Sequence, residues 1–250
     1  MAFPRFFVPL DADSLDRALR EGTEVELPEK AAHHARRALR LRNGETVTIF
    51  AGTGREWQGE IRIERDSAWV KLSNAHDPLR ESPVRMTLLQ AFVSPEKLDW
   101  IIEKAVETGV TEVVLTPAAR SVTRLSGDRL EKRLDKCRDI ARGAAEQCGR
   151  NVVPCVRAAK SLEDALKSVE ADARLMLAPG ADNPAKLDGT MKKIAFAVGP
   201  EGGFSDEEIR LSADLGWSPV LLGPRVLRTE TAGIAAAVWV NTVLGDYPSL

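Results

Sequence analysis

The chain has 250 residues, and its 35 Lys and Arg against 37 Asp and Glu give a formal net charge of −2 at pH 7. Hydrophobic residues make up 44% of it, which is ordinary for a soluble protein and sufficient for two compact units. No stretch resembles a membrane span or a signal peptide, and the three cysteines match no zinc spacing, so we expect a cytoplasmic protein without a metal site or a membrane partner.

The first 75 residues predict a small β-barrel with one helix. The helix is expected at residues 28–41. Three alternating strands follow at 46–50, 57–63 and 68–72, with turn residues between them. A barrel of this size often binds RNA, and because the whole chain is slightly acidic, any affinity for RNA must come from local basic patches.

Arginines gather near the end of the predicted helix, at Arg36, Arg37, Arg40 and Arg42. Arg36 and Arg40 share one helix face. Phosphate contact and a solvated helix face explain this cluster equally well from the residues alone. Arg5 precedes two phenylalanines, and this stretch either holds RNA or forms a strand that packs its phenylalanines into the core.

Residues 76–83 are expected to form a linker, and residues 84–250 a second unit. Strands and helices alternate along this unit, which predicts a parallel sheet with its ligand site at the carboxyl ends of the strands. The expected strands are 84–93, 113–115, 152–156, 175–178, 194–198 and 220–222, and the expected helices are 96–108, 128–148, 162–169, 205–215 and 232–244.

A glycine-rich loop, Gly199–Ser205, directly follows the expected strand 194–198. Its glycines would let a ligand approach the main chain. Ser205 and Glu208 have the spacing of a helix capping box. Acidic residues fill the first turn of that helix and would repel a phosphate, which argues against a phosphate-binding loop. Taken alone, the loop could equally be an ordinary tight turn.

A second loop, at residues 223–232, follows the next strand and also begins with Gly-Pro. Thr229 is expected to cap the following helix, with Glu230 behind it. That helix is apolar nearly all round, so we expect it to be buried on all sides, in a core or in a subunit interface.

These two loops together resemble the signature of the RsmE family, which are 16S ribosomal RNA (uridine-N3) methyltransferases of the SPOUT class. The resemblance extends over nearly the whole chain. Its matching segments are Pro4–Phe7, His33–Arg40, Lys97–Trp100, Lys104–Gly109, Arg120–Leu125, Ala144–Arg150, Gly199–Ser205 and Leu222–Ala232.

The resemblance implies an α/β protein, with a C-terminal parallel-sheet SPOUT domain containing a deep trefoil knot and a small N-terminal PUA-like RNA-binding β-barrel. It implies S-adenosylmethionine as cofactor, a homodimer, and methylation of uridine N3 in 16S rRNA of the small ribosomal subunit. The cofactor-binding residues that it implies are Leu177, Ala178, Pro179, Val198, Gly199, Pro200, Glu201, Gly202, Leu222, Gly223, Arg225, Val226, Leu227, Arg228, Thr231 and Ala232.

Methylation at uridine N3 requires loss of a proton, so a base or a nearby cation would help. All three histidines lie outside residues 84–250, which excludes a histidine base from that unit. We expect Arg120, Arg124, Arg150 or Arg228 to polarise the uracil carbonyls, with Glu146 or Glu230 as a candidate base. The predicted catalytic residues are Arg120, Arg228 and Glu146. Phosphate contact or a salt bridge is the alternative for each arginine.

The predicted RNA-binding residues are Arg5, Arg36, Arg37, Arg124 and Arg150. Three other functions stay open from the sequence. They are another SPOUT-class RNA methyltransferase, a different α/β nucleotide-binding enzyme, and a non-catalytic RNA-binding or ribosome-assembly protein that kept the fold.

Overall fold

The computed structural model describes residues 3–181 and 186–248 and divides into two compact units. The first contains residues 1–81 together with 145–153, and the second contains 82–144 together with 154–250. The chain leaves the first unit within the expected linker. Residues 145–153, which the sequence placed in the second unit, group with the first.

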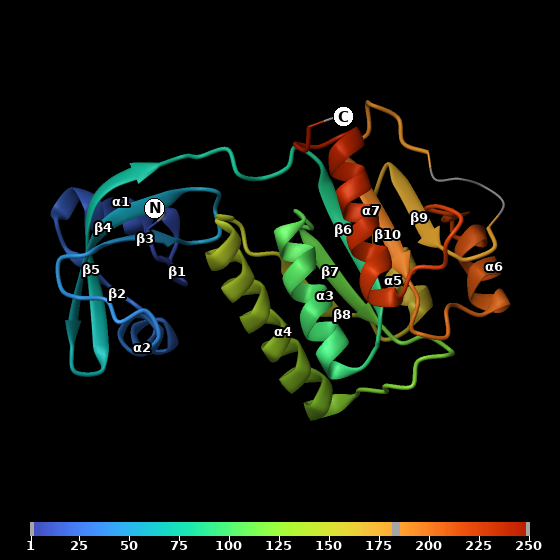
Figure 1. Ribbon diagram of the computed structural model, residues 1–250, viewed down its shortest axis with the longest axis horizontal. Coiled ribbons are helices and arrows are strands. Elements are labelled where there is room, and N and C mark those ends of the chain that lie inside the picture. The colour runs from blue at the N-terminus through green and yellow to red at the C-terminus, as the bar shows by residue number, and fades with distance from the viewer. Residues whose placement is uncertain (1–2, 182–185, 249–250) are drawn as a thin grey trace. The chain divides into compact units, whose positions relative to one another are not determined.

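The first unit contains a five-stranded, mostly antiparallel sheet with strand order β1-β3-β4-β5-β2 and two short helices (Figure 1). Only β1 and β3 pair in parallel. The elements are β1 (Arg5–Phe7), α1 (Ala12–Glu21), β2 (Glu24–Glu26), α2 (Glu29–Arg37), β3 (Thr46–Phe50), β4 (Glu56–Glu64) and β5 (Ser67–His76). The three strands expected from alternation are confirmed as β3, β4 and β5.

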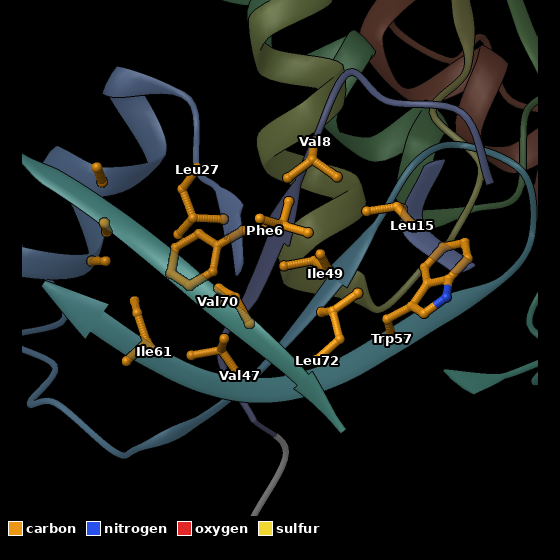
Figure 2. Packing of buried hydrophobic residues seen from close by; sticks show 14 of the residues in the cluster. Phe6, Val8, Leu15, Leu27, Val47, Ile49, Trp57, Ile61, Val70 and Leu72 are labelled. Atoms are coloured by element: carbon orange, nitrogen blue, oxygen red, sulfur yellow. The ribbon is translucent and has the colours of Figure 1, made fainter. Parts of the chain in front are cut away.

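The core of this unit consists of apolar side chains from the sheet, from both helices and from the segments next to them (Figure 2). Phe6 of β1 is fully buried there, so the N-terminal stretch is a strand that packs into the core. Trp57 is also fully buried, and its indole N–H donates to Asp16 of α1 at 2.8 Å. Burial of large side chains such as these is the main stabilising contribution in a unit of this size.

The helices of this unit differ from the prediction in two ways. The sequence predicted one helix and missed α1, although Asp11 caps it by accepting from Ser14 N at 2.8 Å. Helix α2 ends at Arg37 and not at residue 41. The reason is the backbone at Arg40, where φ is 54°, a left-handed conformation that stops a helix of L-residues.

The second unit is built on a six-stranded sheet in the order β11-β9-β10-β6-β7-β8, in which all neighbouring strands run in parallel. This confirms the predicted parallel sheet. Its strands are β6 (Arg85–Ala91), β7 (Glu112–Thr116), β8 (Cys155–Ala158), β9 (Ala173–Leu177), β10 (Lys193–Val198) and β11 (Ser218–Val220). The first of them, β6, lies inside the sheet. The chain adds β7 and β8 on one side of β6, and β9, β10 and β11 lie on its other side.

Helices cover both faces of this sheet (Figure 1). They are α3 (Pro95–Glu107), α4 (Gly127–Cys148, whose last residues belong to the first unit), α5 (Leu162–Lys167), α6 (Asp206–Asp214) and α7 (Thr229–Val243). Apolar side chains of α5 and α6 pack on one face, around Trp217. Helices α3 and α7 pack against each other, and α7 contacts β10 and β6. Covering on both faces explains why the inner strand β10 is apolar from Ile194 to Val198.

The prediction that the last helix is buried on all sides was wrong for the single chain. One face of α7 is buried, including Gly233, Ala237 and Val240. On the opposite face Val238 is 37% exposed, and Val243, which lies about 140° around the helix from Val238, is 48% exposed. A helix that is apolar nearly all round is normally covered on all sides. No element of the described residues covers this side of α7.

The described helices include none that is both long enough and apolar enough to cross a membrane. The trefoil knot, which only the family resemblance implies, stays a prediction.

Candidate functional site

The loops after β9, β10 and β11 enclose a cavity of about 400 Å³, which we call the strand-end cavity. It lies at the carboxyl ends of three neighbouring parallel strands, where ligand sites of open α/β sheets occur. Its volume lies in the range of small-molecule sites. The predicted cofactor-binding residues among its lining are Leu177, Ala178, Pro179, Val198, Gly199, Pro200, Glu201, Leu222, Gly223, Arg225, Val226, Leu227, Arg228 and Ala232.

Two residues of the predicted set are not among the described residues that line this cavity. Gly202 faces Arg120, since a Cβ built on it would lie 3.2 Å from the Cβ of Arg120. Thr231 is exposed on α7. Their expected role in binding a cofactor therefore lacks support from this geometry.

The loop Gly199–Ser205 is held in shape at both ends. Ser205 accepts from Glu208 N at 3.2 Å, and Glu208 accepts from Ser205 N at 2.8 Å, which confirms the predicted capping box. At the other end the main chain is tightly folded, because a Cβ on Gly199 would lie 3.0 Å from Gly203 C and Phe204 N. A side chain at Gly199 would therefore require the main chain of this loop to shift.

Thr229 does not cap α7, so that expectation was wrong. The N-cap is Arg228, which makes no side-chain capping bond. Instead the Thr229 hydroxyl donates to Gly199 O at 2.6 Å and accepts from Gln90 Nε2 at 3.1 Å. Gln90 is fully buried at the end of β6. These bonds join β6 and the two loops that the sequence connected only by analogy.

Lys97 of α3 also lines the cavity, although no pattern in the sequence predicted it there. Its Nζ donates to Glu201 Oε1 at 3.0 Å and lies 3.8 Å from Glu230 Oε2. Burial pushes the pKa of Glu201 upward, but the Lys97 ammonium and nearby backbone N–H groups outweigh it and hold that pKa below its ordinary value. Glu201 is therefore ionised at neutral pH.

The predicted catalytic residues lie in different places. Arg228 lines the strand-end cavity with an exposed side chain. Arg120 is exposed, and its Nη1 donates to Gly202 O at 3.0 Å, on the loop that borders the cavity. Glu146 belongs to the first unit, where its Oε1 accepts from Phe7 N at 2.8 Å. That bond gives Glu146 a structural role and does not favour it as a base.

Arg5 and Arg150 are buried in the first unit. Arg5 Nη1 lies 2.7 Å from Glu56 Oε2 and Arg150 Nη2 lies 2.7 Å from Glu81 Oε2, with both arginine side chains less than 10% exposed. Guanidinium groups in such pairs are not available to phosphates, so this placement favours a structural role over RNA contact.

The other predicted RNA-binding arginines are accessible. Arg37 and Arg124 are exposed, and no hydrogen bond or ion pair within the described part of the chain holds either side chain. Arg36 is partly exposed and pairs with Asp66 at 2.8 Å. Arg40 and Arg42 follow Arg37 closely in the sequence and are exposed as well, and we call these three arginines of the first unit the basic patch.

Over residues 3–181 and 186–248, no group of three or more His, Cys, Asp or Glu side chains is placed to hold a metal ion. The polar groups that line the strand-end cavity are instead suited to an organic ligand. Glu230 Oε2 is a buried carboxylate oxygen with no hydrogen bond among the described residues. A ligand with O–H or N–H donors fits that cavity.

Comparison with protein families gives two matches. A family described as an RNA methyltransferase domain matches residues 80–241, and a family described as an RNA methyltransferase PUA domain matches residues 27–73. Ribosomal RNA small subunit methyltransferase E of Mesomycoplasma hyopneumoniae is 32% identical over 202 residues, which cover 79% of this chain and 86% of that protein. The Bacillus subtilis protein of the same name is 26% identical over 243 residues and 93% of both chains.

Two solved structures are similar to the whole chain. One is a methyltransferase of Legionella pneumophila with bound cofactor SAM, with a TM-score of 0.91, 31% identity and coverage of 99% of this chain and 100% of that one. The other is the ribosomal RNA small subunit methyltransferase E of Neisseria gonorrhoeae bound to S-adenosyl methionine, with a TM-score of 0.87, 31% identity and coverage of 98% and 99%. With matches to both parts of the chain, this protein belongs to the RsmE family of RNA methyltransferases.

Proposed function

We propose that this chain methylates N3 of a uridine in 16S rRNA of the small ribosomal subunit, with S-adenosylmethionine bound in the strand-end cavity. The observation that carries the proposal is this cavity, of about 400 Å³, at the carboxyl ends of β9, β10 and β11. It lies in a chain that is 31% identical to two proteins solved with this cofactor.

The residues of the cavity suit the cofactor. Apolar side chains from the loop after β11, such as Leu222 and Leu227, suit the faces of adenine. Gly199 and Gly203 also line the cavity, and without side chains they let the base or the ribose approach the main chain closely. Glu201 and Glu230 supply acceptors for its hydroxyl and ammonium donors. When bound, the cofactor supplies an activated methyl group on a sulfonium.

The chain's part in the reaction is to orient the uracil and to stabilise its N3 anion. Arg228 is the cation at the cavity, and Arg120 lies on the neighbouring loop through its bond to Gly202 O. Either guanidinium can donate to a uracil carbonyl oxygen and so favour loss of the N3 proton. Glu146 is occupied by Phe7 N, and Glu230, which lines the same cavity, is assigned to the donors of the cofactor, so neither acid is assigned as the base.

Recognition of the RNA would use exposed arginines of both units. We assign this role to the basic patch of the first unit and to Arg124 of the second, all of which are exposed. Two partly exposed apolar side chains of α7, Val238 and Val243, support a homodimer in which a second copy covers this helix.

The test is methyl transfer from labelled S-adenosylmethionine to small ribosomal subunits that lack the modification, followed by nucleoside analysis. Label in N3-methyluridine is the expected result. Label in another nucleoside would keep the methyltransferase and reject the position, and binding of the cofactor without any label on subunits or free rRNA would favour an assembly protein. A chain that binds neither the cofactor nor its product would contradict the proposal altogether.

A further inference from the structure

A single ammonium group connects two carboxylates at one wall of the strand-end cavity. Lys97 lies in the first turn of α3, more than 100 residues away from either acid in the sequence. Its Nζ is 3.0 Å from Glu201, on the loop after β10, and 3.8 Å from Glu230, in the first turn of α7. Three separate segments of the second unit therefore meet at Lys97.

The contact with Glu230 leaves an acceptor unused. A separation of 3.8 Å is too long for a hydrogen bond, and Glu230 Oε2 is buried with no hydrogen-bond partner among the described residues. A buried carboxylate oxygen without a donor destabilises the protein. The Glu230 side chain lines the cavity, so its rotation would bring this oxygen within reach of a ligand O–H or N–H group, and the new hydrogen bond would remove that cost.

The charges around the cavity also favour a donor at this wall. The charged side chains in its lining are Lys97, Glu201, Arg225, Arg228 and Glu230. Both arginines are exposed, and within the described residues neither forms an ion pair. At the wall itself one ammonium faces two carboxylates, which leaves one negative charge unbalanced.

We propose that Lys97 is a positioning residue, which holds Glu201 and Glu230 together as a paired carboxylate acceptor for the hydroxyl or ammonium donors of the nucleoside cofactor. This inference rests on the proposed function, because it takes S-adenosylmethionine and its product as the ligands. Lys97 acts through the two acids and does not itself touch the methyl group.

Removal of the ammonium has a consequence that a structural role would not produce. Without Lys97, the two carboxylates repel each other, and one of them holds its proton to a higher pH. The protonated acid no longer accepts two donors. Ligand affinity of Lys97→Met should therefore fall as the pH is lowered from 8.5 to 5.5, more steeply than for the unaltered protein.

The experiment is calorimetric titration of the full chain with S-adenosylhomocysteine across that pH range. We expect Lys97→Met and Glu230→Gln each to weaken binding about tenfold or more at pH 7. Lys97→Arg keeps the positive charge and should restore most of the affinity. Lys104→Met is the matched control, because Lys104 lies on the same helix and pairs with Glu103 and Glu107 outside the cavity lining.

Melting temperatures without ligand check that each variant folds, and Glu201→Gln provides a second way to disrupt the pair. Equal affinities for the unaltered protein, Lys97→Met and Glu230→Gln would reject the role of this wall and leave the proposed function intact. The same holds if Lys97→Met loses affinity with an unchanged pH profile and Lys97→Arg fails to restore it. Absence of binding by the unaltered protein would instead reject the proposed function.

Discussion

At the scale of single residues, Gly199 and Gly223 occupy corresponding places, each in a Gly-Pro pair near the end of a strand. Their surroundings differ. A Cβ at Gly199 would lie 3.0 Å from main-chain atoms of the same loop, whereas a Cβ at Gly223 would meet nothing within 4 Å. Main-chain atoms cannot move aside as a flexible side chain can. A side chain at Gly199 would therefore require the loop to shift, whereas a side chain at Gly223 would not.

We therefore predict that Gly199→Ala weakens binding of S-adenosylhomocysteine about tenfold or more, because the loop must open to accept the methyl group. Gly223→Ala should bind nearly as well as the unaltered protein. Calorimetric titration of both variants measures the difference. Equal losses at the two positions would mean that loop shape at Gly199 does not control the cavity.

A second prediction concerns Glu56, a buried acid of the first unit. Its side chain is 6% exposed, and it pairs with Arg5 at 2.7 Å and accepts from Asn151 Nδ2 at 3.1 Å. Burial pushes the pKa of Glu56 upward, but these hydrogen bonds and the two nearby arginines hold it below its ordinary value of 4.5. Because the pKa of Glu56 is lower in the folded protein, the ionised carboxylate stabilises the fold at pH values above 4.5. This contribution disappears as the pH falls through the folded-state pKa.

Glu56→Gln should thus destabilise the first unit by about 3–5 kcal/mol at pH 7, because it leaves the buried Arg5 without its counter-charge. The difference from the unaltered protein should shrink as the pH falls below 4.5. Hydrogen exchange resolved by peptide reports on this unit separately. Glu24→Gln, in an exposed pair with Arg62, is the control, and an equal effect of both changes would argue against a special role for burial.

At the scale of elements, the sequence predicted the sheet strands best where their pattern is strong. Strands β3, β4 and β5 follow from alternation, and β10 follows from an unbroken apolar run. The last strand was misplaced, because the sequence favoured the apolar residues 220–222 and the strand is Ser218–Val220. Pro219 lies within it, which is tolerated because β11 is at the edge of the sheet.

Contacts between distant segments explain what the sequence could not predict at the site. The loops after β10 and β11 were foreseen because each carries its own Gly-Pro pattern. Lys97 and Gln90 were missed as site residues. Their partners, Glu201 and Thr229, lie more than 100 residues further along the chain, and no local sequence pattern predicts such contacts. Thr229 was misjudged for the same reason, because its true acceptor, Gly199 O, lies 30 residues earlier.

The turn after α2 gives a prediction at this scale, because the end of the helix at Arg37 leaves Arg37, Arg40 and Arg42 exposed together. Changing all three to Gln should weaken RNA binding. The slope of log affinity against log salt should fall by about two, as expected if each contacts one phosphate of single-stranded RNA. Fluorescence anisotropy with an rRNA fragment measures both quantities.

Arg17 and Arg20 offer a matched control, since they are exposed on α1 of the same unit. Their double change to Gln removes two charges and should leave the salt dependence nearly unaltered. If the two sets of changes reduce the slope in proportion to the charge removed, RNA binding would depend on overall charge and not on the patch.

At the scale of the whole molecule, helix α7 connects the cavity to exposed apolar side chains. Its first turn provides Thr229 and Glu230 to the cavity lining, and Val238 and Val243 are exposed further along the helix. Trp100 of α3, the helix that packs against α7, is 43% exposed as well. Large apolar side chains that remain exposed on adjacent helices are typical of a surface that another chain covers.

We predict that Val238→Asp combined with Val243→Asp converts a dimer into a monomer, because burying two carboxylates in an apolar interface without partners is strongly unfavourable. Sedimentation at micromolar concentration measures the mass. Val122→Asp is the control, since Val122 is 91% exposed on a loop of the same unit and should leave the mass unchanged. An unaltered protein that sediments as a monomer would reject the dimer, and the apolar face of α7 would then need a different partner.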